Sequence, residues 1–172
     1  HAEGCAIFSQ LFHPGREIME SADGLLAVAY APSAVPNERF HVMPRALPVA
    51  LIDEIVAGYA SAARRMHQAG LDGVEVVASH GYLPAQFLNP RLNLRDDAYG
   101  GSDANRQRFL LEVCQAIRAA TDDGFVIGLR ISGGERDDAG LTMEEAITAT
   151  EALEPHLDYV NVTTGTSASV GG

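Results

Sequence analysis

The sequence is poor in cysteine, in basic residues and in long apolar runs, and each shortage excludes a class of protein. Its two cysteines, Cys5 and Cys114, stand far apart inside apolar segments, so neither a disulfide framework nor a metal site with short ligand spacing is indicated. We expect both to be buried, unreactive thiols in a protein from a reducing, cytoplasmic setting. Iron–sulfur clusters need several closely spaced cysteine ligands, which these 172 residues do not contain.

Acidic residues outnumber basic ones by 23 to 12, which gives a formal net charge of −11. Such a chain repels nucleic-acid phosphates and gains no attraction to anionic lipid, so we expect neither as a partner. No apolar run reaches the ~18 residues of a membrane helix, and 47% hydrophobic content is typical of a soluble globular domain. Since the sequence begins at His1 with no initiator methionine and no signal pattern, we expect a soluble chain that has already been cut.

Strand-like and helix-like segments alternate along most of the chain. Continuous apolar runs predict strands over residues 6–11, 73–78, 125–131 and 157–162. Apolar positions at helical spacing predict helices over residues 48–70, 102–120 and 142–153. The last helix begins with Thr142 and Glu145, whose spacing is typical of a hydroxyl and a carboxylate that cap a helix start reciprocally.

The segment between the first strand and the first helix is expected to be a surface excursion. Residues 25–30 are compatible with a strand or hairpin arm. Residues 31–36 must be extended, because each proline disfavours helix at the residue before it.

Nearly continuous apolar strands that alternate with helices are typical of a parallel sheet buried on both faces, so the fold class is α/β. An open doubly wound sheet needs a glycine-rich phosphate turn after a strand, and Gly133-Gly134 is too weak a match. A closed TIM (β/α)8 barrel needs about 250 residues, so four strand-plus-helix repeats make roughly half of one. We therefore predict that residues 1–172 are the central portion of one barrel domain, lacking its first and last βα units.

Two residues just past the second predicted strand have the chemistry of a catalytic site. Barrel enzymes place functional groups at this end of a strand. Tyr82 suits a general acid, because its phenol donates a proton while neutral at pH 7; the alternative is a tyrosine that packs over the loop and hydrogen-bonds backbone. His80 can donate a hydrogen bond to a substrate oxygen on which charge builds; the alternative is a solvent-facing loop histidine.

Arg130 lies inside the apolar run of the third predicted strand. A buried cation is costly unless it meets an anion, so we favour a ligand-binding role. The alternative is an internal salt bridge, for instance to Glu75.

One ordered string carries a family resemblance. It reads Val-Glu-Val-Val-Ala-Ser-His80-Gly-Tyr82-Leu-Pro-Ala-Gln86-Phe-Leu-Asn-Pro90 and closes with Tyr99-Gly-Gly-Ser102 and Asn105-Arg106-Gln-Arg108-Phe109. This string resembles the flavin-dependent Old Yellow Enzyme family, especially its 2,4-dienoyl-CoA reductase and trimethylamine dehydrogenase branch. The resemblance implies an FMN-binding TIM barrel, of which this chain supplies about strands three to six.

The resemblance also implies roles for single residues. It implies that Tyr82 protonates the carbon next to a carbonyl after flavin N5 has given hydride to the carbon beyond it. Gln10 matches the glutamine whose amide pairs with the pyrimidine edge of FMN, and Arg130 matches the arginine beside flavin N1. Val77 departs from the pattern, because most members carry a histidine there, or a tyrosine in the amine dehydrogenases. The second donor beside His80 is therefore missing.

Other residues in the segments that resemble the family are expected to stabilise the backbone by hydrogen bonds. His13 and Arg16 belong to a turn similar to the family's His-Ala-Gly-Arg, where a turn-stabilising role is at least as well supported as contact with flavin or substrate. The long loop must satisfy its own buried backbone groups, and its hydrogen-bonding frame is expected to comprise Gln86, Asn89, Arg91, Asn93, Arg106 and Arg108.

Three functions remain open. The first is an FMN-dependent oxidoreductase that moves hydride from NADH or NADPH to a conjugated carbonyl or enoyl thioester, with a small-molecule substrate. The second is a flavin-dependent amine dehydrogenase or N-demethylase. The third is an inactive barrel segment that only self-associates, because a half barrel exposes two sheet edges. A homo-oligomer is left open, and an iron–sulfur cluster or FAD would lie only in missing regions.

Overall fold

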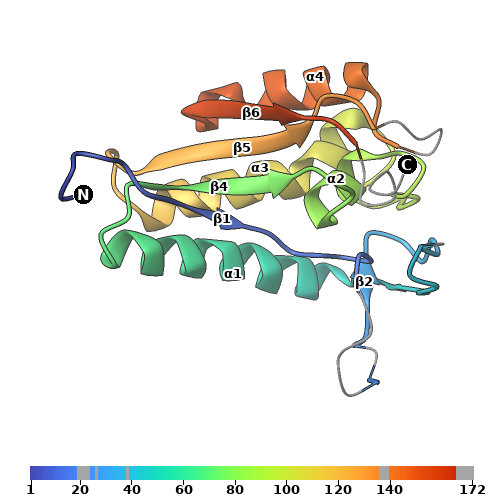
Figure 1. Cartoon of the computed structure of the whole chain (residues 1–172). Coiled ribbons are helices and arrows are strands. Elements are labelled where there is room, and N and C mark those ends of the chain that lie inside the picture. Colours follow the sequence, from blue (N-terminus) through green and yellow to red (C-terminus); the bar gives the residue numbers. More distant parts are fainter. Residues whose placement is uncertain (19–23, 26, 38, 136–139, 166–172) are drawn as a thin grey trace.

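The computed structural model describes residues 1–18, 24–25, 27–37, 39–135 and 140–165 (Figure 1). Its main sheet has the strand order β1-β4-β5-β6, and every neighbouring pair is parallel. These strands are β1 (Phe8–Leu11), β4 (Gly73–Ala78), β5 (Val126–Ser132) and β6 (Tyr159–Thr163). The connections carry α1 (Val49–Gln68), α3 (Asp103–Ala120) and α4 (Met143–Leu153). The predicted α/β class with a parallel sheet is confirmed.

The predicted elements agree with the structure to within about two residues at most ends. Gly70 has a φ of +83° just past α1, which is the left-handed conformation expected after a helix end. The predicted cap of α4 is confirmed: the Glu145 backbone N–H donates to Thr142 Oγ1 at 3.2 Å, and the Thr142 N–H donates to Glu145 Oε2 at 2.9 Å. Local sequence signals therefore define this helix start completely.

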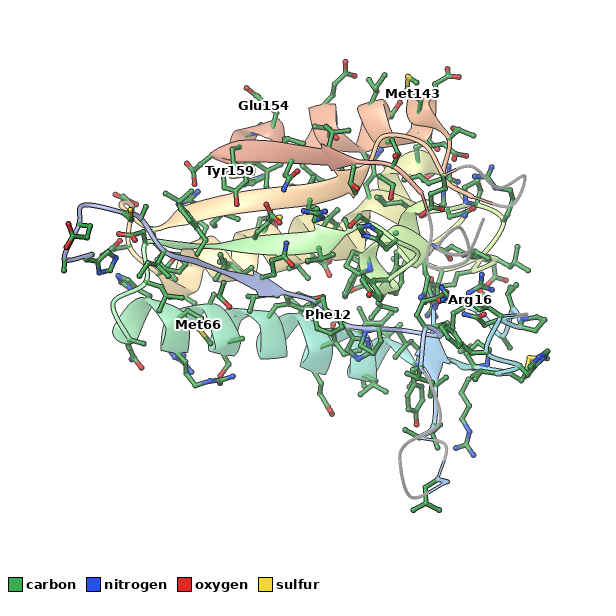
Figure 2. All side chains as sticks on the ribbon, viewed as in Figure 1. Phe12, Arg16, Met66, Met143, Glu154 and Tyr159 are labelled. Atoms are coloured by element: carbon green, nitrogen blue, oxygen red, sulfur yellow. The ribbon has the colours of Figure 1, made fainter. Side chains whose placement is uncertain are left out.

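One face of the sheet forms the hydrophobic core. Val74 and Val76 of β4 and the aliphatic residues Ile127 and Leu129 of β5 are fully buried against the helices that lie along this side of the sheet in Figure 1. Phe109 of α3 stacks on Phe87 with ring centroids 4.4 Å apart. The opposite face carries polar side chains, and Figure 2 shows Tyr159 of β6 on that face. The sheet is thus apolar toward its helices and polar toward the side on which a barrel would close.

Four expectations need correction. Residues 25–30 do not form a hairpin arm: of them only Tyr30 is in a strand, β2 (Tyr30–Ala31), which pairs in parallel with β3 (Arg45–Ala46), while residue 26 lies outside the described ranges. The excursion is not purely a surface feature, because Ala31 and Leu47 are only 2% exposed. A short helix, α2 (Leu83–Leu88), stands inside what was expected to be loop. Cys5 is exposed, because it precedes β1 in an unpacked segment, whereas Cys114 is buried as predicted.

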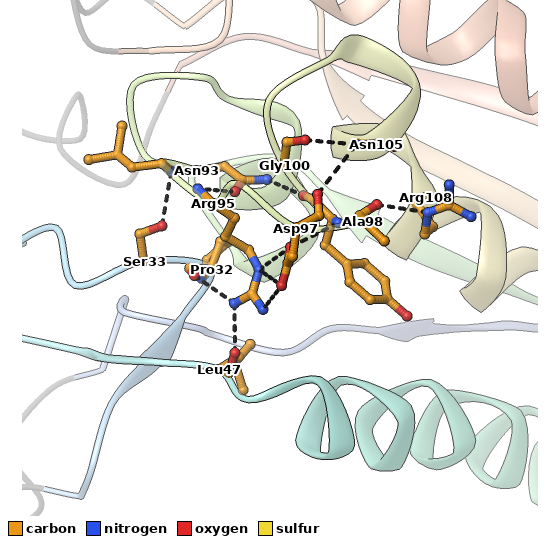
Figure 3. A network of polar contacts seen from close by, with 12 residues as sticks. Pro32, Ser33, Leu47, Asn93, Arg95, Asp97, Ala98, Gly100, Asn105 and Arg108 are labelled. Carbon is orange, nitrogen blue, oxygen red and sulfur yellow. Dashed lines mark hydrogen bonds and ion pairs between the residues drawn. The ribbon is translucent and has the colours of Figure 1, made fainter.

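The loop between α2 and α3 is held by its own side chains, as predicted (Figure 3). Asn93 Nδ2 donates to the carbonyls of Phe87 and Tyr99 at 2.8 and 2.7 Å. Arg95, which the sequence did not single out, donates to the Pro32 and Leu47 carbonyls at 3.0 and 2.6 Å. The other members of the frame bond backbone or acidic groups through the side chains of Gln86, Asn89, Arg91, Arg106 and Arg108.

No helix within the described ranges is long and apolar enough to cross a bilayer. Within the same ranges, no group of three or more His, Cys, Asp or Glu side chains could hold a metal ion.

Candidate active site

All four residues predicted for the site border one hollow at the carboxyl ends of β1, β4 and β5. Parallel strands present these ends at the same edge of the sheet, which is where barrel enzymes carry their active sites. The hollow is open and has a cavity volume of about 360 Å3; its lining is Gln10, Phe12, Val77, His80, Tyr82 and Arg130. Residues up to 120 positions apart in the sequence therefore lie around one hollow. Their chemical roles remain predictions.

Gln10 reaches its register partner Glu75 across β1 and β4. Its Nε2 atom donates to Glu75 Oε1 at 2.6 Å. The other carboxylate oxygen accepts hydrogen bonds at 3.1 Å from the Tyr159 hydroxyl and from Asn161 Nδ2, both on β6. Glu75 is 5% exposed, so a nearly buried carboxylate ties the first strand of the sheet to the last.

Arg130 projects from the middle of β5, opposite Val77 of β4 and Asn161 of β6. It is half-buried and makes no hydrogen bond or ion pair with any residue that the structure describes. The alternative of a salt bridge to Glu75 is wrong, because the donors to that carboxylate are Gln10, Tyr159 and Asn161. A guanidinium without a counter-ion beside an open hollow is suited to bind an anionic or electron-rich ligand edge.

His80 is held in an unusual backbone conformation at the end of β4. Its φ is +58°, a left-handed value that non-glycine residues adopt rarely and that clusters at functional sites. Its N–H donates to Ser132 Oγ at 3.2 Å, and its Nδ1 lies 2.7 Å from Ser79 Oγ. Desolvation by burial, and then the positive charge of Arg130, lower the pKa of His80 below its ordinary 6.5. The imidazole is therefore neutral near pH 7.

Tyr82 stands at the start of α2 and points its ring at the hollow. The ring centroid lies 5.3 Å from that of Phe12 and 6.3 Å from that of His80. Its backbone is fixed at both ends, because its N–H donates to the Ser79 carbonyl and its carbonyl accepts from the Gln86 N–H. The hydroxyl makes no hydrogen bond to a described residue. The phenol is thus positioned by backbone while its proton is left available.

The turn at residues 13–16 supports the site and contributes no group to this hollow. His13 Nδ1 accepts from the Gly15 N–H at 3.0 Å, and burial lowers the pKa of His13. Arg16 donates to the Pro36 carbonyl at 2.7 Å and lies beside β2 (Figure 2). Gln86 bonds the carbonyls of Pro14 and Gly81 at 3.2 and 2.7 Å, which fastens the turn to the end of β4.

Phe12, Tyr159 and Asn161 were missed from the sequence. Phe12 follows Gln10 by two positions, and Asn161 follows Tyr159 by two, so the two-residue period of a strand puts each pair on one face. This two-residue period was the signal that the sequence offered for these residues. It does not show which face of a strand borders a ligand site, so it could not be used.

Comparisons with known proteins agree with the fold. The family described as NADH:flavin oxidoreductase / NADH oxidase matches residues 1–169. An NADH oxidase of Thermoanaerobacter brockii is 39% identical over 155 residues, which are 90% of this chain and 24% of that protein. A multifunctional alkene reductase/demethylase of Caballeronia cordobensis is 38% identical over 167 residues, or 96% of this chain and 24% of that protein.

Among solved structures, 2-naphthoyl-CoA reductase in complex with 2-naphthoyl-CoA superposes with a TM-score of 0.86 at 32% sequence identity. The match covers 99% of this chain and 28% of that one. The chain therefore spans about a quarter of the length of these three proteins, and its fold is that of a partial TIM barrel.

Proposed function

This chain belongs to the NADH:flavin oxidoreductase / NADH oxidase family, and from that premise we propose that it is the central portion of one FMN-binding barrel in a longer oxidoreductase. The proposed reaction moves hydride from NADH or NADPH through the flavin to a conjugated carbonyl or an enoyl thioester. One observation carries the proposal: Gln10, His80, Tyr82 and Arg130 line a single hollow. A cytoplasmic location, a small-molecule substrate and a homo-oligomer belong to the same proposal.

The residues of the hollow fit FMN. Arg130 offers a half-buried cation with no counter-ion among the described residues, as an electron-rich edge of a reduced flavin requires. The amide oxygen and one amide N–H of Gln10 make no hydrogen bond to a described residue, which suits the alternating acceptor and donor atoms of a pyrimidine ring. Phe12 and Val77 supply apolar surface for the ring face. When bound, FMN supplies the hydride.

The chain's own residues supply the proton and polarise the substrate. Tyr82 would give its phenolic proton to the substrate carbon next to the carbonyl. The His80 ring is neutral, and a hydrogen bond from the Ser79 hydroxyl to Nδ1 would leave the ring proton on Nε2. That Nε2–H would donate to the substrate carbonyl oxygen, where negative charge builds.

Val77 narrows the proposed substrate class. It is 4% exposed and its side chain has no polar atom, so the hollow offers one imidazole donor to the substrate oxygen where two are usual in the family. The resemblance to the dienoyl-CoA reductase branch implies that loss of this second donor is tolerable for an enoyl or dienoyl thioester. The name of 2-naphthoyl-CoA reductase, which also denotes a thioester, supports this choice.

One observation supports the second candidate function, a flavin-dependent amine dehydrogenase or N-demethylase. Phe12 and Tyr82 both line the hollow, with ring centroids 5.3 Å apart, and aromatic rings attract alkylammonium groups. The relative named alkene reductase/demethylase combines both activities in its name. In this second candidate function an amine C–H would give hydride to the flavin, and the Tyr82 proton would not be used.

The deciding experiment is anaerobic absorption spectroscopy of the full-length protein. We expect a flavin band that NADH or NADPH bleaches and that an enoyl thioester or enone restores, while methylated amines leave it unchanged. Bleaching of the flavin band by methylated amines and not by reduced nicotinamide would instead establish an amine dehydrogenase or N-demethylase. A colourless full-length protein that takes up no FMN would refute both; a coloured full-length protein beside a colourless, self-associating 172-residue segment would show that this segment alone is inactive.

A further inference from the structure

We infer that Glu75 is a positioning residue that turns the amide oxygen of Gln10 into the hollow, so that the site accepts a ring N–H. The inference rests on the proposed function, because the ring in question is the pyrimidine ring of FMN. Glu75 lines no part of the hollow itself and acts through Gln10.

The surroundings of Glu75 are complementary to an ionised carboxylate. Three donors meet its two oxygens: Gln10 Nε2 at 2.6 Å, the Tyr159 hydroxyl at 3.1 Å and Asn161 Nδ2 at 3.1 Å. An ionised carboxylate accepts hydrogen bonds and donates none. Burial and the bond to Glu75 raise the pKa of Tyr159 to about 12, so its hydroxyl remains a donor throughout the physiological range.

The Glu75 carboxylate determines which atom of the Gln10 amide, oxygen or nitrogen, faces the hollow. The oxygen and nitrogen of a side-chain amide are nearly equal in size, so the group can present either one to a ligand. A carboxylate at 2.6 Å tolerates only the NH2 group on its side, because oxygen facing oxygen is repulsive. The Gln10 oxygen, which makes no hydrogen bond to a described residue, must then face away from Glu75. It is therefore held ready to accept from an N–H.

The same layer of the sheet keeps Glu75 in place. Gly128 stands in register between Glu75 and Tyr159, and the ring of Tyr159 occupies the space that a side chain at 128 would fill. The Tyr159 hydroxyl and the Asn161 amide hold the far carboxylate oxygen, which leaves the near one for Gln10. The orientation of the Gln10 amide thus depends on Glu75, 65 positions away, which is itself held by residues 84 and 86 positions beyond it.

The test compares the dissociation constants of FMN and of FMN methylated at ring atom N3, measured on the flavin-free full-length protein. We expect the wild type to prefer FMN by about tenfold or more, since the methyl group removes one hydrogen bond. In Glu75→Gln the residue-10 amide can flip, and the preference should fall to about twofold. Tyr159→Phe is the matched control: it removes one bond to Glu75 but keeps the Gln10 contact, so the preference should persist.

A double-mutant cycle separates positioning from general structural damage. If Glu75 acts through Gln10, the Glu75→Gln change lowers the preference for FMN over N3-methylated FMN in the wild-type background. The same change has no further effect on this preference in Gln10→Ala. An equal effect in both backgrounds overturns the inference, and so does a wild type that binds FMN without any preference. A wild type that binds no FMN at all refutes the proposed function itself, and the inference falls with it.

A neutron structure of the wild type in deuterium oxide gives a second answer, which holds even if Glu75→Gln does not fold. Two deuterium atoms on the residue-10 amide atom that faces Glu75 are the expected result. Deuterium on the amide atom that faces the hollow overturns the inference.

Discussion

Gly128 of β5 lies directly against the ring of its register partner Tyr159: a Cβ atom at position 128 would stand 2.1 Å from Tyr159 Cζ. The missing side chain lets the Tyr159 hydroxyl pass over β5 and reach Glu75 on β4 at 3.1 Å. A glycine in a strand normally weakens the sheet, but here it marks a close approach.

Gly128→Ala should displace the Tyr159 ring and break its bond to Glu75. We expect a loss of about 1–3 kcal/mol in the free energy of unfolding, the usual cost of overpacking, measured by denaturant titration. Gly58→Ala is the matched control, because a Cβ there meets nothing within 4 Å and alanine is the better helix former by up to about 1 kcal/mol. Equal stability of Gly128→Ala and wild type would contradict the role assigned to Gly128.

Arg95→Lys should loosen the long loop. The guanidinium donates at once to the Pro32 and Leu47 carbonyls and pairs with Asp97, and an ammonium cannot match this planar fork. We expect destabilisation by about 1.5–3 kcal/mol in thermal or denaturant unfolding. Exposed Arg64 on α1 provides the control, since Arg64→Lys should leave stability unchanged.

Tyr82→Phe should separate the two half-reactions. Reduction of the flavin by NADH or NADPH needs no proton from Tyr82, so its stopped-flow rate should stay the same. Reoxidation by an enone or enoyl thioester should slow by about 10²–10⁴-fold, the usual contribution of a general acid. Tyr30→Phe, outside the hollow, should change neither rate. Equal slowing of both half-reactions, or of neither, would remove Tyr82 from the mechanism.

Arg130→Met should make the flavin harder to reduce. Losing a cation beside the reduced ring removes stabilisation of its negative charge. A loss of about 1.4 kcal/mol corresponds to a fall of about 30 mV in the two-electron midpoint potential. Dye-equilibrated reductive titration measures this shift, and Arg64→Met is the control. An unchanged potential would show that Arg130 does not contact the flavin.

His13 should make stability depend on pH. Burial lowers its pKa in the folded state below the ordinary 6.5, and protonation of Nδ1 would break the bond from the Gly15 N–H. The unfolded chain therefore binds a proton first as the pH falls. The stability contribution of His13 is complete above pH 6.5 and is lost as the pH falls from 6.5 toward the lowered folded-state value.

His13→Asn should remove part of this slope, because the asparagine oxygen can accept from Gly15 without titrating. Unfolding midpoints measured between pH 5 and pH 8 test the difference. A variant with the same slope as the wild type would contradict the assignment to His13.

The sequence by itself determined the elements whose signals are local. The Thr142–Glu145 cap, the helical spacing of α1 and the apolar runs of β4 and β5 depend on residues within a few positions of one another. The ordered string around His80 and Tyr82 likewise pointed to the family without coordinates. These predictions succeeded because each signal lies within a short stretch of the sequence.

Only the tertiary structure decided the rest. It showed that Arg130 lacks an ion pair with Glu75 and that Gln10, Tyr159 and Asn161 bond that carboxylate instead. It also revealed the parallel pairing of β2 with β3. These contacts join residues from 15 to 86 positions apart and are set by strand register. Register is a global outcome of core packing, and a two-residue periodicity in one strand does not specify which side chain of another strand it will meet.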